Sequence, residues 1–148
     1  MNARGGGPEG SVFERPHAAL AGSYRSLIRE FLDRDEELIP FPLRFENDDF
    51  DAFLAALDAC RRGEGLADGF VANSTFWLVA EGEVVAVSNL RHALTPSLRR
   101  EGGHIGYGVR PSARRRGHAS ALLRATLREA AALGIEEALL TCAKENEP

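Results

Sequence analysis

Cysteine is scarce in this sequence, and long apolar runs are absent. The two cysteines, Cys60 and Cys142, are far apart and have neither the spacing of a metal site nor that of a disulfide framework. No uninterrupted apolar run approaches the length that crosses a membrane, and the polar first ten residues lack the apolar segment of a signal peptide. We therefore expect a reduced, cytoplasmic protein with no metal site and no membrane partner.

An excess of positive charge is also missing. The chain has 148 residues and a formal net charge of −4, whereas nucleic-acid binding normally requires a basic face. The hydrophobic fraction of 44% and the charged fraction of 27% are ordinary for a globular protein. We expect a disordered, glycine-rich tail over residues 1–10 and a single domain over residues 11–148 that binds no nucleic acid.

Positive charge is instead concentrated in one turn. Residues 104–110 predict a strand, and residues 117–134 have the apolar spacing of a helix, with RRRGHA between them at residues 114–119. Backbone N–H groups at a helix start lack partners inside the helix and carry partial positive charge. This turn therefore suits an anion such as a diphosphate. A solvated basic turn without a ligand is the alternative.

Two details of this strand and helix are specific enough to test. Gly106 and Gly108 interrupt the strand, which indicates a bulge or the close approach of another group. The helix has one apolar stripe, and we expect its residues to face the core. The stripe consists of Ala119, Leu122, Leu123, Thr126, Leu127 and Ala130.

The remaining segments predict a mixed α/β domain. Apolar periodicity predicts helices over residues 18–35 and from Asn47 or Asp48 to about residue 62. Acidic residues on these helices either attract a cationic amine or form a solvent face, and we favour the solvent face. Residues 38–45 contain two prolines and are expected to be extended. Strands are predicted over residues 12–15, 75–80, 83–91 and 135–142. The last is expected to lie parallel to residues 104–110. Phe76 and Trp77 are expected to face opposite sides of the sheet.

The order Arg114-x-x-Gly117-x-Ala119, between a strand and an amphipathic helix, resembles the pyrophosphate-binding motif of the GNAT superfamily of N-acetyltransferases. That motif is written Gln/Arg-x-x-Gly-x-Gly/Ala. The resemblance runs from about Val12 to the last residue and is strongest to a bacterial subgroup known as predicted acetyltransferases. Its further elements here are Ile39-Pro40-Phe41, Arg91-His92, residues 102–111 and Thr141-Cys142.

The resemblance implies a particular fold. It is a mixed, mostly antiparallel sheet with a central parallel strand pair splayed at the cofactor site, and with helices on both faces. The family continues with a further helix and two strands, so the resemblance implies a domain that is incomplete at its C-terminus. An open sheet edge at that position favours a homodimer.

The resemblance also implies a cosubstrate, acetyl-CoA. Its diphosphate is expected on the turn, its pantetheine arm along the backbone of residues 107–109, and its thioester near Tyr107. Asn146 matches an asparagine that lies near the cofactor in relatives. The expected cofactor-binding residues are Val109, Arg114, Arg115, Arg116, Gly117, His118, Ala119 and Asn146.

The implied reaction is direct attack of a primary amine, on a small molecule or a peptide, on the acetyl carbonyl. His104 is the first candidate for the general base, although a histidine packed on the sheet is an equally good interpretation. Tyr107 is the candidate acid, and His92 is a third possibility for proton transfer. The alternatives are a non-catalytic acyl-CoA-binding domain and a phosphate- or nucleotide-binding module.

Overall fold

One antiparallel sheet organises the part of the chain that the computed structural model describes, residues 10–139. Its strands are β1 (Val12–Glu14), β2 (Asn73–Ala80), β3 (Glu83–Arg91) and β4 (Ile105–Val109), and they lie in the order β1-β2-β3-β4. Every neighbouring pair is antiparallel. The predicted first strand and hairpin are therefore confirmed.

The predicted parallel strand over residues 135–142 is not seen in the described part of the chain. Residues 135–139 form no strand, and residues 140–142 lie outside the described residues. Leu139 nevertheless lies beside the start of β4, because its carbonyl accepts a hydrogen bond from the His104 N–H at 2.7 Å. The chain thus returns from the last helix to the edge of β4 that β3 leaves open.

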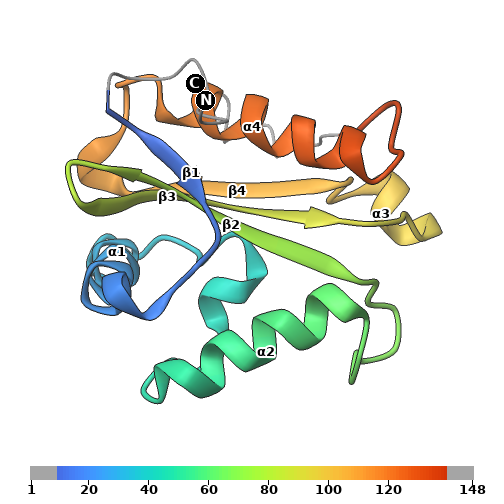
Figure 1. Ribbon diagram of the computed structural model, residues 1–148, viewed down its shortest axis with the longest axis horizontal. Helices are drawn as coiled ribbons and strands as arrows, with labels where there is room; N and C mark the ends of the chain where they lie inside the picture. Colours follow the sequence, from blue (N-terminus) through green and yellow to red (C-terminus); the bar gives the residue numbers. More distant parts are fainter. Residues whose placement is uncertain (1–9, 140–148) are drawn as a thin grey trace.

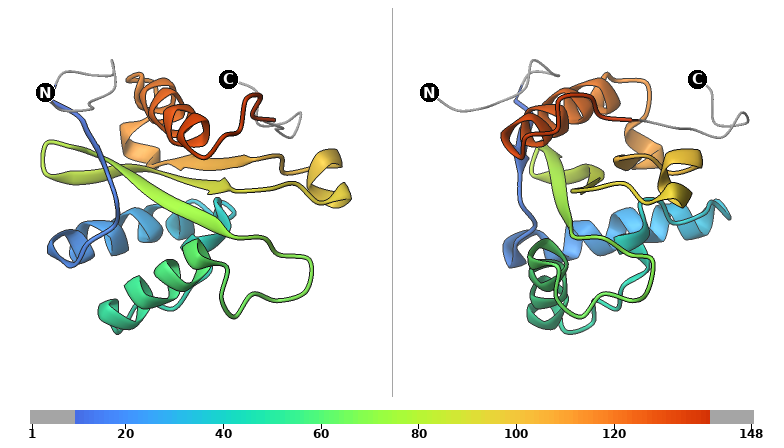
Figure 2. Two further views of the ribbon diagram at one scale, coloured as in Figure 1. Left: turned by 45° about the vertical axis from the view of Figure 1, so that its right-hand side comes forward. Right: turned by 90° about the vertical axis from the view of Figure 1, so that its right-hand side faces the viewer.

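Helices cover both faces of the sheet, as Figures 1 and 2 show. The helices α1 (Ala21–Asp33) and α2 (Phe50–Arg62) lie on one face, and α4 (His118–Ala132) lies on the other. This layered arrangement confirms the expected mixed α/β class. A short helix, α3 (Pro96–Arg100), and three single-turn helices complete the described elements. The single turns are η1 (Ala18–Leu20), η2 (Phe41–Arg44) and η3 (Pro111–Ala113).

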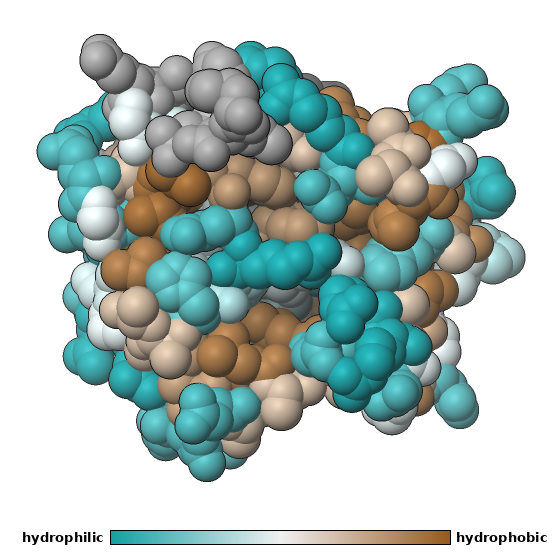
Figure 3. Space-filling view, in the orientation of Figure 1, coloured by the Kyte–Doolittle hydropathy of each residue, from teal (hydrophilic) through white to brown (hydrophobic). Residues whose placement is uncertain are grey.

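The sheet separates two apolar cores. Trp77 is fully buried beneath α1 and α2, with its ring 5.2 Å from the ring of Tyr24. Phe76, its neighbour in β2, packs on the α4 side, which confirms that these two residues face opposite ways. On the surface view of Figure 3, hydrophilic residues are scattered among smaller hydrophobic areas.

The buried face of α4 agrees with the predicted stripe in part, since Leu122, Thr126 and Ala130 are buried. Leu127 is 40% exposed, whereas Ala121 and Ala125 are buried. The helix is therefore turned so that alanines face the sheet, which lets its backbone approach closely. Thr126 is satisfied in this position because its hydroxyl donates to the Leu122 carbonyl at 2.7 Å and lies 2.8 Å from the Ser88 hydroxyl.

The segment between α1 and α2 was expected to be extended and is partly helical. Residues 41–44 form η2, and Pro42 sits in its first turn, where a missing backbone N–H removes no helical bond. The predicted start of α2, at Asn47 or Asp48, was one or two residues early. Its N-cap is Asp49, whose carboxylate accepts from the Ala52 N–H at 3.1 Å.

Candidate functional site

The turn between β4 and α4, at the left of Figure 1, leads into the start of α4. Arg115 and Gly117 have left-handed backbone angles, with φ of 65° and 83°, and residues 114–117 are exposed. Gly117 is the N-cap, and its carbonyl accepts from the Ala121 N–H at 3.2 Å. Within residues 10–139, the N–H groups of residues 118–120 have no acceptor. This local geometry suits an anion.

The three arginines of the turn have different surroundings. Arg114 donates both terminal nitrogens to Glu36, at 2.6 and 2.9 Å, and its guanidinium lies 5.6 Å from the ring centre of Phe31. Arg115 and Arg116 are exposed and have no acidic partner among the described residues. The charge available to a ligand therefore comes mainly from Arg115 and Arg116.

The pairing with Arg114 changes the pKa of the Glu36 carboxyl. Its hydrogen bonds with Arg114 hold the pKa of this carboxyl below its usual 4.5, and the charges of Arg114 and Arg34 lower it further against the effect of burial. The Arg114 Nε also donates to the Val109 carbonyl at 3.2 Å. Arg114 thus ties the turn both to the end of β4 and to the chain that follows α1.

A second arginine network, which the sequence did not reveal, lies directly beneath the turn. Arg110 is only 3% exposed, and it donates to Glu30 at 2.8 Å and to the backbone carbonyls of Val84 and Ser23. Glu30 also accepts from the Ser112 N–H at 2.9 Å. Nothing in the local sequence distinguishes Arg110 from the exposed arginines that follow it.

The Glu30 carboxyl titrates below its usual range. Burial raises its pKa, but hydrogen bonds from Arg110 and Ser112 and the charge of Arg110 outweigh this and hold the pKa below 4.5. The ionised carboxylate therefore joins α1, the end of β4 and η3. This network fixes the position from which the turn departs.

His118 and Ala119 open α4. The His118 side chain is 5% exposed, and its Nδ1 has no hydrogen-bond partner among the described residues. Burial and the nearby Arg116 lower the pKa of this imidazole against an opposing effect of Glu81, which keeps the ring neutral at neutral pH. The expected part of His118 in cofactor binding stays a prediction. Ala119 is half-buried.

The outer edge of β4 offers a row of backbone groups. The residues on either side of β4 both bond to β3 or its end: the His104 carbonyl accepts from the Arg91 N–H, and the Arg110 N–H donates to the Val85 carbonyl. Bonding alternates along an antiparallel pair, so every second residue between them points its N–H and C=O away from β3. Within the described residues no strand pairs with this edge. The outward-pointing residues are Ile105, Tyr107 and Val109.

His104 is bonded at both its backbone and its ring. Its Nδ1 accepts from the Leu139 N–H at 2.9 Å, so the other ring nitrogen, Nε2, carries the proton of the neutral imidazole. Burial lowers the pKa of His104, and the charges of Arg99 and Arg91 lower it further. The expected role as a general base therefore requires the bond to Leu139 to break first.

The two candidate catalytic side chains project to opposite faces of β4. Tyr107 packs with the core on the α4 side. His104 lies an odd number of residues away from Tyr107, on the same side as Gly106 and Gly108, which faces α1 and α2. The structure therefore places His104 and Tyr107 along one strand but does not bring their side chains together.

The glycines of β4 accommodate the chain itself. The predicted bulge is wrong, because β3 and β4 pair regularly and the one irregularity in the described sheet is at Leu78 and Val79. The predicted close approach is confirmed: a Cβ on Gly108 would collide with the Ile39 carbonyl, and one on Gly106 would lie 3.5 Å from the Pro40 side chain. The α1–α2 connection thus crosses β4 on this face.

His92, the third candidate for proton transfer, lies further from the edge of β4. Its Nε2 is 2.8 Å from the Ser74 hydroxyl, and Ser74 belongs to β2, which does not neighbour β4. Burial lowers the pKa of His92, and the charges of Arg61 and Arg15 lower it further. The structure does not group His92 with the turn.

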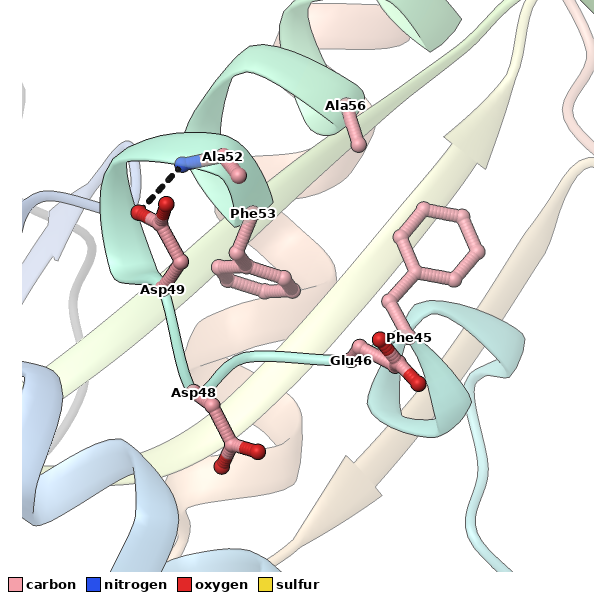
Figure 4. Close-up of a pocket in the computed structure, with 7 residues that line it drawn as sticks. All are labelled: Phe45, Glu46, Asp48, Asp49, Ala52, Phe53 and Ala56. Carbon is pink, nitrogen blue, oxygen red and sulfur yellow. Dashed lines mark hydrogen bonds between the residues drawn. The ribbon is translucent and has the colours of Figure 1, made fainter.

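An acidic pocket lies at the start of α2 (Figure 4) and has a volume of about 490 Å³. The Asp49 carboxylate is turned back onto the Ala52 N–H, so part of the acidic charge caps the helix. None of the predicted site residues lines this pocket. Its lining residues are Phe45, Glu46, Asp48, Asp49, Ala52, Phe53 and Ala56.

Other expectations concern metals, membranes and the two ends of the chain. Among residues 10–139, no three histidine, cysteine or acidic side chains are grouped to hold a metal ion. No helix in this described range is both long and apolar enough to span a bilayer. Asn146, Cys142 and the predicted N-terminal tail up to residue 9 lie outside the described residues.

Comparison with known families identifies the class of protein that this fold and turn define. The model of the acetyltransferase (GNAT) family matches residues 27–148. Since the match covers most of the chain, the protein belongs to the GNAT acetyltransferase family. This membership supports acetyl transfer in general, with an acyl-CoA donor and an acceptor. A comparison with curated proteins found no match.

Proposed function

We propose that the protein is an N-acetyltransferase that transfers the acetyl group of acetyl-CoA to a primary amine. The observation that carries this proposal is the row of unpaired N–H groups at the start of α4. This row comes just after β4 in the chain, and β4 has an edge with which no strand pairs within the described residues. In CoA the diphosphate is joined to the pantetheine arm. The N–H groups at the helix start suit the diphosphate, and the adjoining open strand edge suits the amides of the pantetheine arm. Family membership supplies the chemical class.

The diphosphate is assigned to the N–H groups of residues 118–120 and to the exposed Arg115 and Arg116. A hydrogen bond to a charged group contributes about 1.5–3 kcal/mol, so three or four such bonds hold a ligand firmly. The Asn146 contact expected from the family stays a prediction. Arg114 contributes indirectly, since its bonds to Glu36 and Val109 fix the shape of the turn.

The pantetheine arm is assigned to the outward-facing backbone of Tyr107 and Val109. Its amides can bond there as a neighbouring strand would. The Val109 carbonyl already accepts from Arg114, so the Val109 N–H is the group left for the thioester oxygen. An N–H placed there stabilises the negative charge that develops when an amine attacks the carbonyl.

Proton transfer completes the reaction. An alkylammonium is protonated at neutral pH, so the amine must lose a proton before or during attack. We assign this step to His104, through the nitrogen that is freed when the Leu139 bond opens, and assign protonation of the leaving thiolate to Tyr107. The products are an N-acetylated amine and CoA, and no acyl-enzyme is formed.

The second candidate is a non-catalytic acyl-CoA-binding domain. The specific observation in its favour is that the only acceptor lone pair of the neutral His104 ring is already bonded. Release of thiol from acetyl-CoA with a panel of amines distinguishes the two candidates. Binding of acetyl-CoA without thiol release for any amine would favour the binding domain.

Two glycines provide a matched test of the diphosphate site. Gly117 and Gly134 lie at opposite ends of α4, with φ of 83° and 87°, so a side chain strains the backbone similarly at both. We expect Gly117→Val to weaken acetyl-CoA binding by more than about tenfold, or about 1.4 kcal/mol, and Gly134→Val to leave it unchanged. Calorimetric titration with acetyl-CoA measures both.

Each outcome of this titration is informative. Equal affinities in the two variants would remove the diphosphate from the turn. ATP provides the remaining control, because a nucleotide-binding module would bind ATP as well as it binds acetyl-CoA. Binding of ATP without binding of acetyl-CoA would reject the acetyltransferase proposal.

A further inference from the structure

We propose that the acceptor amine also carries a carboxylate or a similar small anionic group, and that Arg91 binds this group beside Gly106. The inference rests on the proposed acetyl transfer and narrows its substrate class to amino acids and other acidic amines. It depends on where Arg91 lies, what neutralises it and which part of the site it faces.

Arg91 extends from the end of β3 across the amino-terminal end of β4. Its NH1 donates to the carbonyls of Gly102 and Gly103, both at 3.0 Å, which orients the guanidinium. Its NH2 lies 3.8 Å from the position that a Cβ would occupy on Gly106. Because Gly106 has no side chain, the guanidinium reaches over the strand at this position.

No carboxylate among residues 10–139 pairs with Arg91. Its NH2 and Nε also have no acceptor in this described range, although the side chain is half-buried. Burial lowers the pKa of Arg91, since it disfavours the charged form. A ligand with negative charge would offset this cost and satisfy the remaining donors.

The charges around the neighbouring His104 have the same sign. The groups that act on its pKa are Arg99 and Arg91, and both are cationic. Two acidic residues of α1 and α2 are engaged elsewhere, Glu30 with Arg110 and Asp58 with Arg61 and Arg62. The other two, Asp33 and Asp51, are exposed. The region where the amine is expected to enter is therefore suited to an anionic rather than a dicationic acceptor.

The anionic group proposed to bind Arg91 is distinct from the CoA diphosphate. The diphosphate is assigned to the turn beyond the other end of β4, and a five-residue strand such as Ile105–Val109 spans roughly 13 Å. Arg91 instead lies over Gly106, next to Tyr107, where the thioester is expected. An amino acid whose carboxylate bonds to the planar guanidinium has its amine on the adjacent carbon, close to that thioester.

Matched acceptors test the proposal. Glycine, alanine, phenylalanine, glutamate and lysine are each compared with the corresponding amide, in which the carboxylate is replaced by a neutral group. Thiol release gives kcat/KM for each acceptor. We expect the acids to be preferred over their amides by about tenfold or more.

Variants connect this preference to Arg91. In Arg91→Gln the acid-to-amide ratio is expected to fall close to one, through loss of activity with the acids and not with the amides. Arg91→Lys keeps the charge and is expected to retain part of the ratio. Arg100→Gln removes an exposed arginine of α3 and is expected to leave the ratio unchanged.

Failure of the inference is distinguishable from failure of the proposed function. Acetyl-CoA titration of the same proteins reports the proposed function independently of the acceptor. If acetyl-CoA binds and the wild-type protein treats acids and amides equally, or prefers the amides, the role of Arg91 is rejected. If acetyl-CoA does not bind, the acetyltransferase proposal is itself rejected, and this inference with it.

A binding measurement tests the proposal even if the Arg91 variants are unstable or none of the tested amines reacts. The wild-type protein, saturated with CoA, is titrated with N-acetylglycine and with N-acetylglycinamide. We expect the carboxylate to bind at least about tenfold more tightly than the amide. Equal binding, or none for either compound, would overturn the assignment.

Discussion

The arginines beside the two ends of β4 have different hydrogen-bond partners. At the carboxyl end, the two arginines nearest the strand, Arg110 and Arg114, each bond to a glutamate from α1 or from the residues just after it, and only Arg115 and Arg116, further along the turn, lack an acidic partner among the described residues. At the amino end, Arg91 bonds to backbone carbonyls and has no carboxylate partner among the described residues. The comparison separates arginines that hold the fold together from arginines whose charge is left for a ligand.

Removing Arg110 should have the largest effect on stability. We expect Arg110→Ala to lower the free energy of unfolding by about 3–5 kcal/mol, because Glu30 and the carbonyls of Val84 and Ser23 lose a buried donor. Urea unfolding, followed by the fluorescence of the buried Trp77, measures the change.

The exposed Arg100 is the matched control for Arg110. Arg100→Ala should change the free energy of unfolding by no more than about 0.5 kcal/mol. A loss below about 1 kcal/mol for Arg110→Ala would mean that the network is not a structural element, and the contrast between the two ends of β4 would disappear.

The glycines of β4 provide the next largest effect. Gly108→Ala should destabilise the protein by about 1–3 kcal/mol, because the added methyl group collides with the Ile39 carbonyl. Gly106→Ala should be nearly neutral, because its methyl group would meet Pro40 at 3.5 Å, an ordinary contact distance. Thermal or urea unfolding of both variants checks this, and equal stability losses would show that the α1–α2 connection does not cross β4 at Gly108.

Acid sensitivity should give the smallest of these effects. The pKa of Glu30 is held below its usual 4.5 in the folded state, so the unfolded chain binds more protons. Its contribution to stability is therefore fully present above pH 4.5 and is lost as the pH falls through the folded-state value. The stability difference between wild type and Glu30→Gln should shrink between pH 7 and about pH 3.

Unfolding curves at several pH values measure this difference. Glu46→Gln is the control, since Glu46 is exposed and forms no ion pair within the described part of the chain. A Glu30→Gln difference that stays constant over this pH range would show that the carboxylate does not stabilise the folded state through Arg110.

The features that the sequence predicted correctly depend on neighbouring residues. The hairpin of β2 and β3 follows from two apolar runs separated by Glu81 and Gly82, and α4 follows from its apolar period. The unpaired N–H groups at the start of α4 follow from its N-cap at Gly117, since a helix start always leaves such groups. Local chemistry was sufficient for each of these.

The features that the sequence missed depend on residues far apart in the chain. Arg110 and Glu30 are separated by 80 positions, and Arg114 and Glu36 by 78. Only the packing of α1 against the end of β4 brings these residues together. The burial of Ala121 and Ala125 in α4 was also missed, because alanine is too weakly apolar to mark a buried face by pattern alone.

The sequence by itself determined the order of most elements, the family and the position of the turn whose N–H groups are unpaired, because these depend on local hydrogen-bonding capacity and spacing. Tertiary structure decided which arginines remain available to a ligand. That selection depends on which glutamates the folded chain brings within hydrogen-bonding distance, and no local pattern specifies those distances.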